Sequence, residues 1–126
     1  MGYYTRFSIE IRTAITKAEA KEIARAINHA FAPLVKSEEN WIFSLDDYLC
    51  ANVEDDEKAT WDIMPYDELK WYDWEEDMKA IAKEYPEIEF RVEGSGEDRD
   101  DWWVALLKGD RYQIKYVEPP IDEWED

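Results

Sequence analysis

The sequence predicts a single α+β domain in which one antiparallel sheet of five to six strands carries two helices on one face. Three observations predict this class. Several short segments alternate apolar and polar residues, as half-buried strands do. Two longer segments place apolar residues at helical spacing behind a capping residue, and short turns join most of the strands. The predicted order is β-α-β-β-α-β-β-β, in one domain over residues 1–120 followed by an acidic tail over residues 121–126.

The first strand and the first helix are the clearest elements of the N-terminal half. Residues 3–12 alternate, and the apolar side of this strand is formed by Tyr3, Phe7, Ile9 and Ile11. Thr16 and Glu19 have the spacing of a capping box. A helix is therefore expected to begin after Thr16 and to end near Pro33, which cannot continue it. Its inward stripe comprises Ala20, Ile23, Ile27, Ala30 and either Phe31 or Leu34.

The middle of the chain predicts two strands and the second helix. Residues 41–45 and 59–64 are expected to be strands, with an acidic turn or loop between them. The second helix is expected over Trp74–Glu84, because Asp73 and Glu76 repeat the capping pattern and Pro86 follows the end. Its inward stripe comprises Trp74, Met78, Ile81 and Ala82.

The C-terminal part predicts a further strand and a hairpin. Residues 88–93 alternate cleanly, and the Gly-Ser-Gly sequence of residues 94–96 is a turn signal. Residues 102–107 and 111–117 are expected to pair around a Lys-Gly-Asp turn, and the Pro-Pro sequence of residues 119–120 ends the sheet. The hairpin residues expected to face the core are Tyr112, Ile114 and Tyr116.

The composition predicts a folded, acidic, cytoplasmic protein. The 126 residues include 15 Lys and Arg against 32 Asp and Glu, which gives a formal charge of −17. Such a charge repels nucleic acid and anionic lipid, so neither is expected as a direct partner. The longest uncharged run, residues 26–35, is far shorter than a membrane span, and no signal peptide is expected at the N-terminus. Seven Trp, eight Tyr and four Phe argue against disorder.

The charge is unevenly distributed along the chain. Residues 1–36 contain six basic and three acidic side chains, whereas the remaining ninety residues contain nine basic and 29 acidic ones. Acidic clusters recur at residues 54–57, 73–77, 97–101 and 122–126. A solvated acidic surface explains any one cluster, and adaptation to high salt is a further alternative. Because mutual repulsion destabilises a compact state, four clusters together also suggest a basic partner.

No combination of residues in the sequence predicts catalysis. His29 is the only histidine and is expected on the surface, and Cys50 is the only cysteine, beside carboxylates that disfavour a thiolate. The acidic clusters do not have the spacing of an EF-hand loop. We therefore expect no enzymatic activity, no cofactor and no metal site.

The most distinctive segment, residues 70–78, reads Lys-Trp-Tyr-Asp-Trp-Glu-Glu-Asp-Met. Tryptophan and tyrosine are favoured at interfaces, and neighbouring carboxylates suit a basic partner. The alternative is that Trp71 and Tyr72 only attach the start of the helix to the core. The predicted partner-contact residues are Trp71, Asp73, Glu75, Glu76, Asp77, Glu97, Asp98, Asp100, Asp101 and Trp102.

Residues 70–120 resemble a group of small acidic phage and prophage proteins of largely unassigned function. The resemblance rests on the segment at residues 70–78, Tyr85-Pro86, Phe90 and the Gly-Ser-Gly-Glu-Asp sequence of residues 94–98. It continues through Asp101-Trp102 and the turn at residues 108–110 to the Tyr-Val-Glu-Pro sequence of residues 116–119. Trp74 stands where the related proteins usually have histidine. The resemblance implies a mobile-element setting, in which small acidic proteins often inhibit host defence nucleases.

Three functions are compatible with these features. The first is an anti-defence inhibitor, of the anti-CRISPR or anti-restriction kind, that occupies the basic nucleic-acid groove of a host nuclease or CRISPR effector. The second is an immunity or antitoxin protein that caps a basic toxin by the same electrostatics. The third, a small hydrolase, has the least support, because the chain has one histidine, one cysteine and no nucleotide-binding motif.

Overall fold

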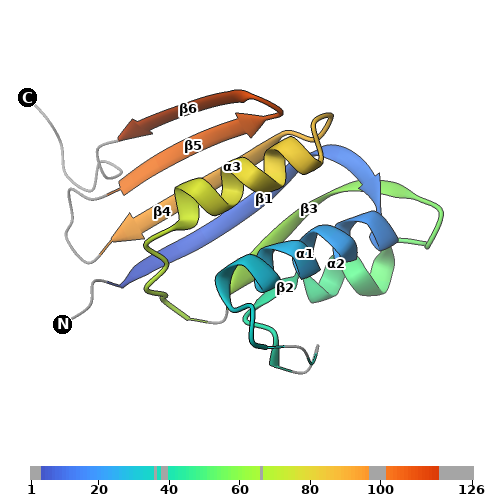
Figure 1. The fold of residues 1–126 in the computed structure, drawn as a ribbon. Coiled ribbons are helices and arrows are strands. Elements are labelled where there is room, and N and C mark those ends of the chain that lie inside the picture. Colours follow the sequence, from blue (N-terminus) through green and yellow to red (C-terminus); the bar gives the residue numbers. More distant parts are fainter. Residues whose placement is uncertain (1–3, 36, 38–39, 66, 97–101, 117–126) are drawn as a thin grey trace, which may run out of the picture.

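The computed structural model describes residues 4–35, 37, 40–65, 67–96 and 102–116. Its six strands form one antiparallel sheet in the order β2-β3-β1-β4-β5-β6, and α1 and α3 lie side by side on one face (Figure 1). The elements are β1 (Thr5–Thr16), α1 (Lys17–Phe31), β2 (Phe43–Leu45), α2 (Asp47–Asn52), β3 (Lys58–Pro65), α3 (Trp74–Glu84), β4 (Phe90–Gly96), β5 (Trp102–Lys108) and β6 (Arg111–Tyr116). The predicted α+β class with a single antiparallel sheet is therefore confirmed.

The short helix α2 was not expected from the sequence. It occupies part of the segment for which the charges predicted only an acidic turn or loop. The Asp46 carboxylate accepts hydrogen bonds from the backbone N–H groups of Tyr48 and Leu49, at 2.8 and 3.2 Å, and so starts the helix. None of the residues of α2 is fully buried, so no apolar stripe marks the helix in the sequence.

The core lies between the sheet and the two longer helices. Ile9 at the centre of β1 pairs with Ile63 of β3 on one side and Val92 of β4 on the other, and all three are fully buried. The capping box of Thr16 and Glu19 is present, as predicted. The helix residues expected to point inward do so: Ile23, Ile27, Met78 and Ile81 are buried, and Trp74 packs partly buried against the core.

Aromatic side chains fill the space where α3 begins. The Trp71 indole lies 5.3 Å from the Phe7 ring and 5.2 Å from the Phe43 ring, measured between centroids. Trp74 stacks on Trp103 of β5 at 4.1 Å with an interplanar angle of 11°. The aromatic residues that argued against disorder therefore form much of the core.

Several local predictions were wrong. Asp73 precedes α3 but its side chain makes no capping hydrogen bond, so the second capping box does not form. Residues 94–96 extend β4 instead of turning, because Gly94 pairs with both Phe7 and Trp103. Tyr116 is 66% exposed, so it does not belong to the core as expected. Of the two alternatives for the end of the inward stripe of α1, Phe31 packs partly buried against the core, whereas Leu34 is 91% exposed.

Some boundaries also differ from the predicted ones. Strand β2 contains only residues 43–45 of the predicted segment 41–45, and β1 continues to Thr16, four residues beyond the predicted end. Tyr3, the end of the predicted hairpin at residue 117, the Pro-Pro sequence and the acidic tail lie outside the described residues.

Candidate partner-binding surface

Four acidic residues of the distinctive segment lie at the start of α3, one just before the helix and three in its first turn, and they divide into two kinds. Asp73 and Glu76 are exposed. Glu75 and Asp77 are half-buried and bonded within the protein: Glu75 accepts a hydrogen bond from the Tyr112 hydroxyl, and Asp77 accepts one of 2.8 Å from the Trp71 indole N–H. Two of the four carboxylates therefore also hold α3 against its neighbours.

Tyr112 shows how closely Glu75 is tied to the sheet. Tyr112 lies on β6, and the Lys79 ammonium is 4.2 Å from the centre of its ring. Burial, followed by the hydrogen bond to the Glu75 carboxylate, raises the pKa of the Tyr112 phenol. One side of α3 thus packs its charged residues against β6, whereas the other side faces α1.

Of the remaining predicted contact residues, the structure places Trp71 in the core and Trp102 on the opposite face of the sheet. Trp71 is 5% exposed and packs in the core, so it attaches the start of α3 to the core and offers no exposed ring. Trp102 is half-buried and neighbours Trp103, which is buried under the helices, so strand alternation places Trp102 on the opposite face of the sheet. Glu97, Asp98, Asp100 and Asp101 lie outside the described residues.

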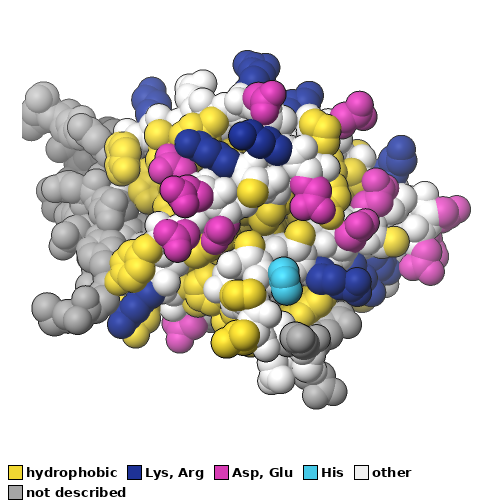
Figure 2. All heavy atoms as spheres, in the orientation of Figure 1, with side chains coloured by type: hydrophobic (Ala, Val, Ile, Leu, Met, Phe, Trp, Pro, Cys, Tyr) yellow, Lys and Arg dark blue, Asp and Glu magenta, His cyan; other side chains and the backbone are white. Residues whose placement is uncertain are grey.

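A groove with a volume of about 510 Å³ runs between α1 and α3. Figure 2 shows this face, with carboxylates on both sides of an apolar strip and His29 beside it. Small or aliphatic side chains form the apolar part, and charged or polar ones surround it. The lining residues are Glu22, Arg25, Ala26, His29, Ala30, Asp77, Ala80, Ile81, Glu84 and Tyr85.

The charges of two carboxylates act on Tyr85 at the end of the groove where α3 finishes. Burial, followed by the charges of Glu22 and Glu84, raises the pKa of the Tyr85 phenol. Both carboxylates therefore act on the same position, although they belong to different helices. Sequence reasoning did not identify Glu22, Glu84 or Tyr85, because each reads locally as a solvated helix residue or a helix end.

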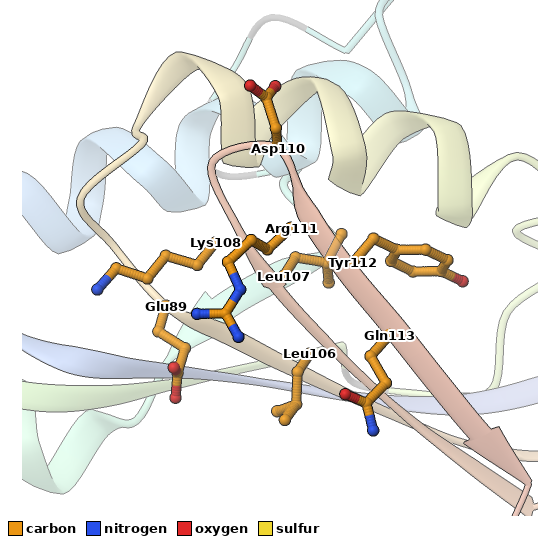
Figure 3. Close-up of a pocket in the computed structure, with 8 residues that line it drawn as sticks. All are labelled: Glu89, Leu106, Leu107, Lys108, Asp110, Arg111, Tyr112 and Gln113. Atoms are coloured by element: carbon orange, nitrogen blue, oxygen red, sulfur yellow. The ribbon is translucent and has the colours of Figure 1, made fainter.

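The hairpin of β5 and β6 bounds a second hollow of about 450 Å³ (Figure 3). Lys108, Arg111 and Glu89 lie on one side of it, and Asp110 points away. Glu89 is already paired with Arg12, at 3.4 Å between the carboxylate oxygen and the guanidinium Nε. Because opposite charges alternate here, this hollow selects no class of partner.

Within the described residues, no group of three or more histidine, cysteine, aspartate or glutamate side chains is placed to hold a metal ion. His29 is exposed on α1, as predicted, and Cys50 is a free, half-buried thiol on α2. None of the helices in the described parts of the chain has the length and apolar character needed to span a membrane.

Comparison of the chain with protein-family models, with curated proteins and with solved structures finds no match in any of the three.

Asp62 on the far face of the sheet gives a pH-dependent prediction. Burial, and then the charges of Glu10 and Asp46, raise the pKa of its carboxyl above the ordinary value of 3.8. The folded state therefore binds the proton more tightly than the unfolded state, and stability is lost as pH rises through the raised pKa. Asp62→Asn should raise the urea midpoint at neutral pH.

The higher urea midpoint of Asp62→Asn should disappear below the ordinary pKa of aspartate, because Asp62 is then protonated in both the folded and the unfolded state. The matched control is Asp56→Asn, which removes the same charge from an exposed position and should shift the midpoint much less. An equal gain from both variants at neutral pH would mean that only the overall negative charge matters.

Proposed function

We propose that this is a non-enzymatic protein of a phage or other mobile element that binds a basic protein partner through its helix face. Its action is to inhibit a host defence nuclease, such as a CRISPR effector, by occupying the surface that binds nucleic acid. The proposal is supported by the charge of the chain and, within the fold, by the arrangement of carboxylates on α3.

The observation that carries the proposal is an uncompensated row of carboxylates along α3. The acidic row comprises Asp73, Glu76, Asp77 and Glu84, whose spacing places them on one side of the helix. Among the described residues, none of the four is in an ion pair, since the five pairs within 4.0 Å involve other carboxylates. The two lysines of α3 are not paired with the row either: Lys79 lies over the Tyr112 ring, and Lys83 is in none of these five ion pairs.

These carboxylates also favour the helix, because negative side chains near its first turn interact well with the helix dipole. That contribution accounts for Glu76 and Asp77 of the row, but Glu84 lies at the opposite end of the helix, where a negative charge is unfavourable. The extension of the row to this end therefore supports a binding role rather than a purely structural one.

A basic nucleic-acid groove is the partner surface that such a face fits best. Duplex DNA carries one negative charge per about 1.7 Å of its axis, and proteins that bind it present matching basic surfaces. The ninety residues from residue 37 onward carry twenty more acidic than basic side chains. An acidic face of this kind competes with DNA for the same surface and gains from the same release of counterions.

The proposal is tested with immobilised protein and a panel of purified DNA-binding nucleases that includes CRISPR effectors. We expect one nuclease to bind at low salt and to bind much more weakly at moderate salt, because exposed charges are screened over about 8 Å at physiological ionic strength. Asp73→Asn combined with Glu76→Gln should weaken binding roughly threefold to tenfold, mainly through slower association.

These two residues are chosen because they are exposed and make no hydrogen bond to another element among the described residues, unlike Glu75 and Asp77. The control is Glu54→Gln combined with Asp56→Asn, which removes two charges from an exposed turn elsewhere. Binding that is indifferent to salt and to the α3 variant would contradict the proposal.

A further inference from the structure

We infer that the groove between α1 and α3 is a receptor for an arginine side chain of the basic partner. This inference rests on the proposed function and deepens it, since it names the chemical group that the helix face recognises. It is carried by three features of the groove: its apolar floor, the carboxylates of its two walls, and the tyrosine at its end.

The floor suits the stem of a long cationic side chain. Ala26 and Ala30 of α1 face Ile81 of α3, and small side chains at two of these positions leave the groove its volume of about 510 Å³. Arginine and lysine bury their methylene stems on apolar surface while their charged ends stay in polar surroundings. An uncharged apolar residue would fill the same floor but would leave the surrounding carboxylates without a counter-charge.

The walls supply that counter-charge from both helices. Glu22 of α1 and Glu84 of α3 are exposed, line the same groove and both act on the Tyr85 phenol. In the described part of the chain, neither is in an ion pair. A guanidinium donates along several directions of one plane and can therefore bond to two carboxylates, whereas an ammonium is a compact point charge.

Tyr85 favours arginine over lysine for a second reason. Its ring lines the groove beside these carboxylates and is half-buried. Guanidinium groups stack on aromatic faces through cation–π attraction more often than ammonium groups do. A carboxylate pair beside an aromatic ring thus combines the two interactions by which arginine is recognised.

Arg25 and His29 also line the groove and disfavour a bound cation there, but the position of each side chain limits this effect. The guanidinium carbon of Arg25 lies 6.0 Å from the centre of the Trp41 ring, so this charge is directed toward Trp41. His29 is exposed near the end of α1, at the other end of the groove from Glu22. Asp77, which also lines the groove, accepts the Trp71 hydrogen bond and is left unchanged in the test.

The test is an NMR titration of the full chain, labelled at its alanine methyl groups, with a short peptide that alternates glycine and arginine. Peptides with lysine or citrulline in place of arginine are titrated in parallel. We expect the arginine peptide to shift the methyl signals of Ala26, Ala30 and Ala80, which line the groove. Glu22→Gln combined with Glu84→Gln should weaken its binding roughly tenfold.

The charge-matched control, Glu54→Gln combined with Asp56→Asn, should change the affinity by less than about twofold. An equal loss in both double variants would overturn the groove inference but would leave the proposed function intact, because overall acidity would then suffice. Equal binding of the lysine peptide, or no shift of the groove methyl signals, would also overturn the inference. Failure of the proposed function is judged separately, by the nuclease panel.

Discussion

Gly94→Ala is expected to destabilise the protein by roughly 3 kcal/mol, at the upper end of the range for an overfilled core. A Cβ atom added at Gly94 would lie 2.1 Å from Cζ2 and 2.3 Å from Cε2 of Trp103. Trp103 cannot move aside freely, because its ring stacks on Trp74 at 4.1 Å and meets the Phe7 ring edge-on at 6.0 Å. Urea unfolding at neutral pH measures the loss.

Two further variants separate this clash from a general effect on β4. Ser95→Ala changes the next, exposed residue of the strand and should alter stability by less than about 0.5 kcal/mol. In a Trp103→Ala background the added methyl group has room, so the further cost of Gly94→Ala should be small. If Gly94→Ala destabilises the Trp103→Ala protein as much as the natural chain, the clash with Trp103 is not the cause of the destabilisation.

Asn28→Ala is expected to cost about 3 kcal/mol, since it leaves several buried backbone groups without partners. The Asn28 amide donates to the carbonyl oxygens of Ala24 and Phe43, and its oxygen accepts from the N–H groups of Ile42 and Phe43, each at 2.8 Å. The side chain is 5% exposed. It therefore joins α1 to the edge strand β2 much as a neighbouring strand would.

Asn52→Ala is the matched control, because that amide donates a single exposed hydrogen bond of 2.7 Å to Tyr48, and it should cost less than about 1 kcal/mol. Asn28→Asp places a second oxygen opposite the two carbonyl groups and should also lower the free energy of unfolding. This loss should become smaller at acid pH, where a protonated carboxyl group can again donate a hydrogen bond. A loss for Asn28→Ala no larger than that for Asn52→Ala would contradict the assigned role.

The elements with a regular apolar period could be predicted from the sequence. Helix α3 begins and ends where the stripe and Pro86 indicated, and the hairpin forms around its predicted turn. The spacing of apolar residues and the residue types of turns are local features of the sequence. The spacing indicates which side of an element is buried, and the turn residues indicate where the element ends. Helix α2 depends on the capping carboxylate of Asp46, and the extension of β4 depends on the pairing of Gly94 with Trp103. Neither feature produces a regular spacing of apolar residues in the sequence.

The binding surface was less accessible to sequence reasoning for a related reason. The acidic motif located Asp73 and Glu76 on an exposed turn, but it could not show that Trp71 fills the core or that Trp102 lies on the opposite face. Glu22 and Glu84 are 62 positions apart in the sequence and line one groove only because α1 packs against α3.

If this protein inhibits a nuclease by occupying its nucleic-acid surface, the protein and DNA must compete for that one basic surface. The most direct measurement is the fluorescence anisotropy of labelled DNA bound to the nuclease identified by the panel, during titration with this protein. We predict complete displacement of the DNA, with an apparent inhibition constant that rises linearly with the DNA concentration. A ternary complex that keeps the DNA bound at saturating protein would contradict competition for one surface.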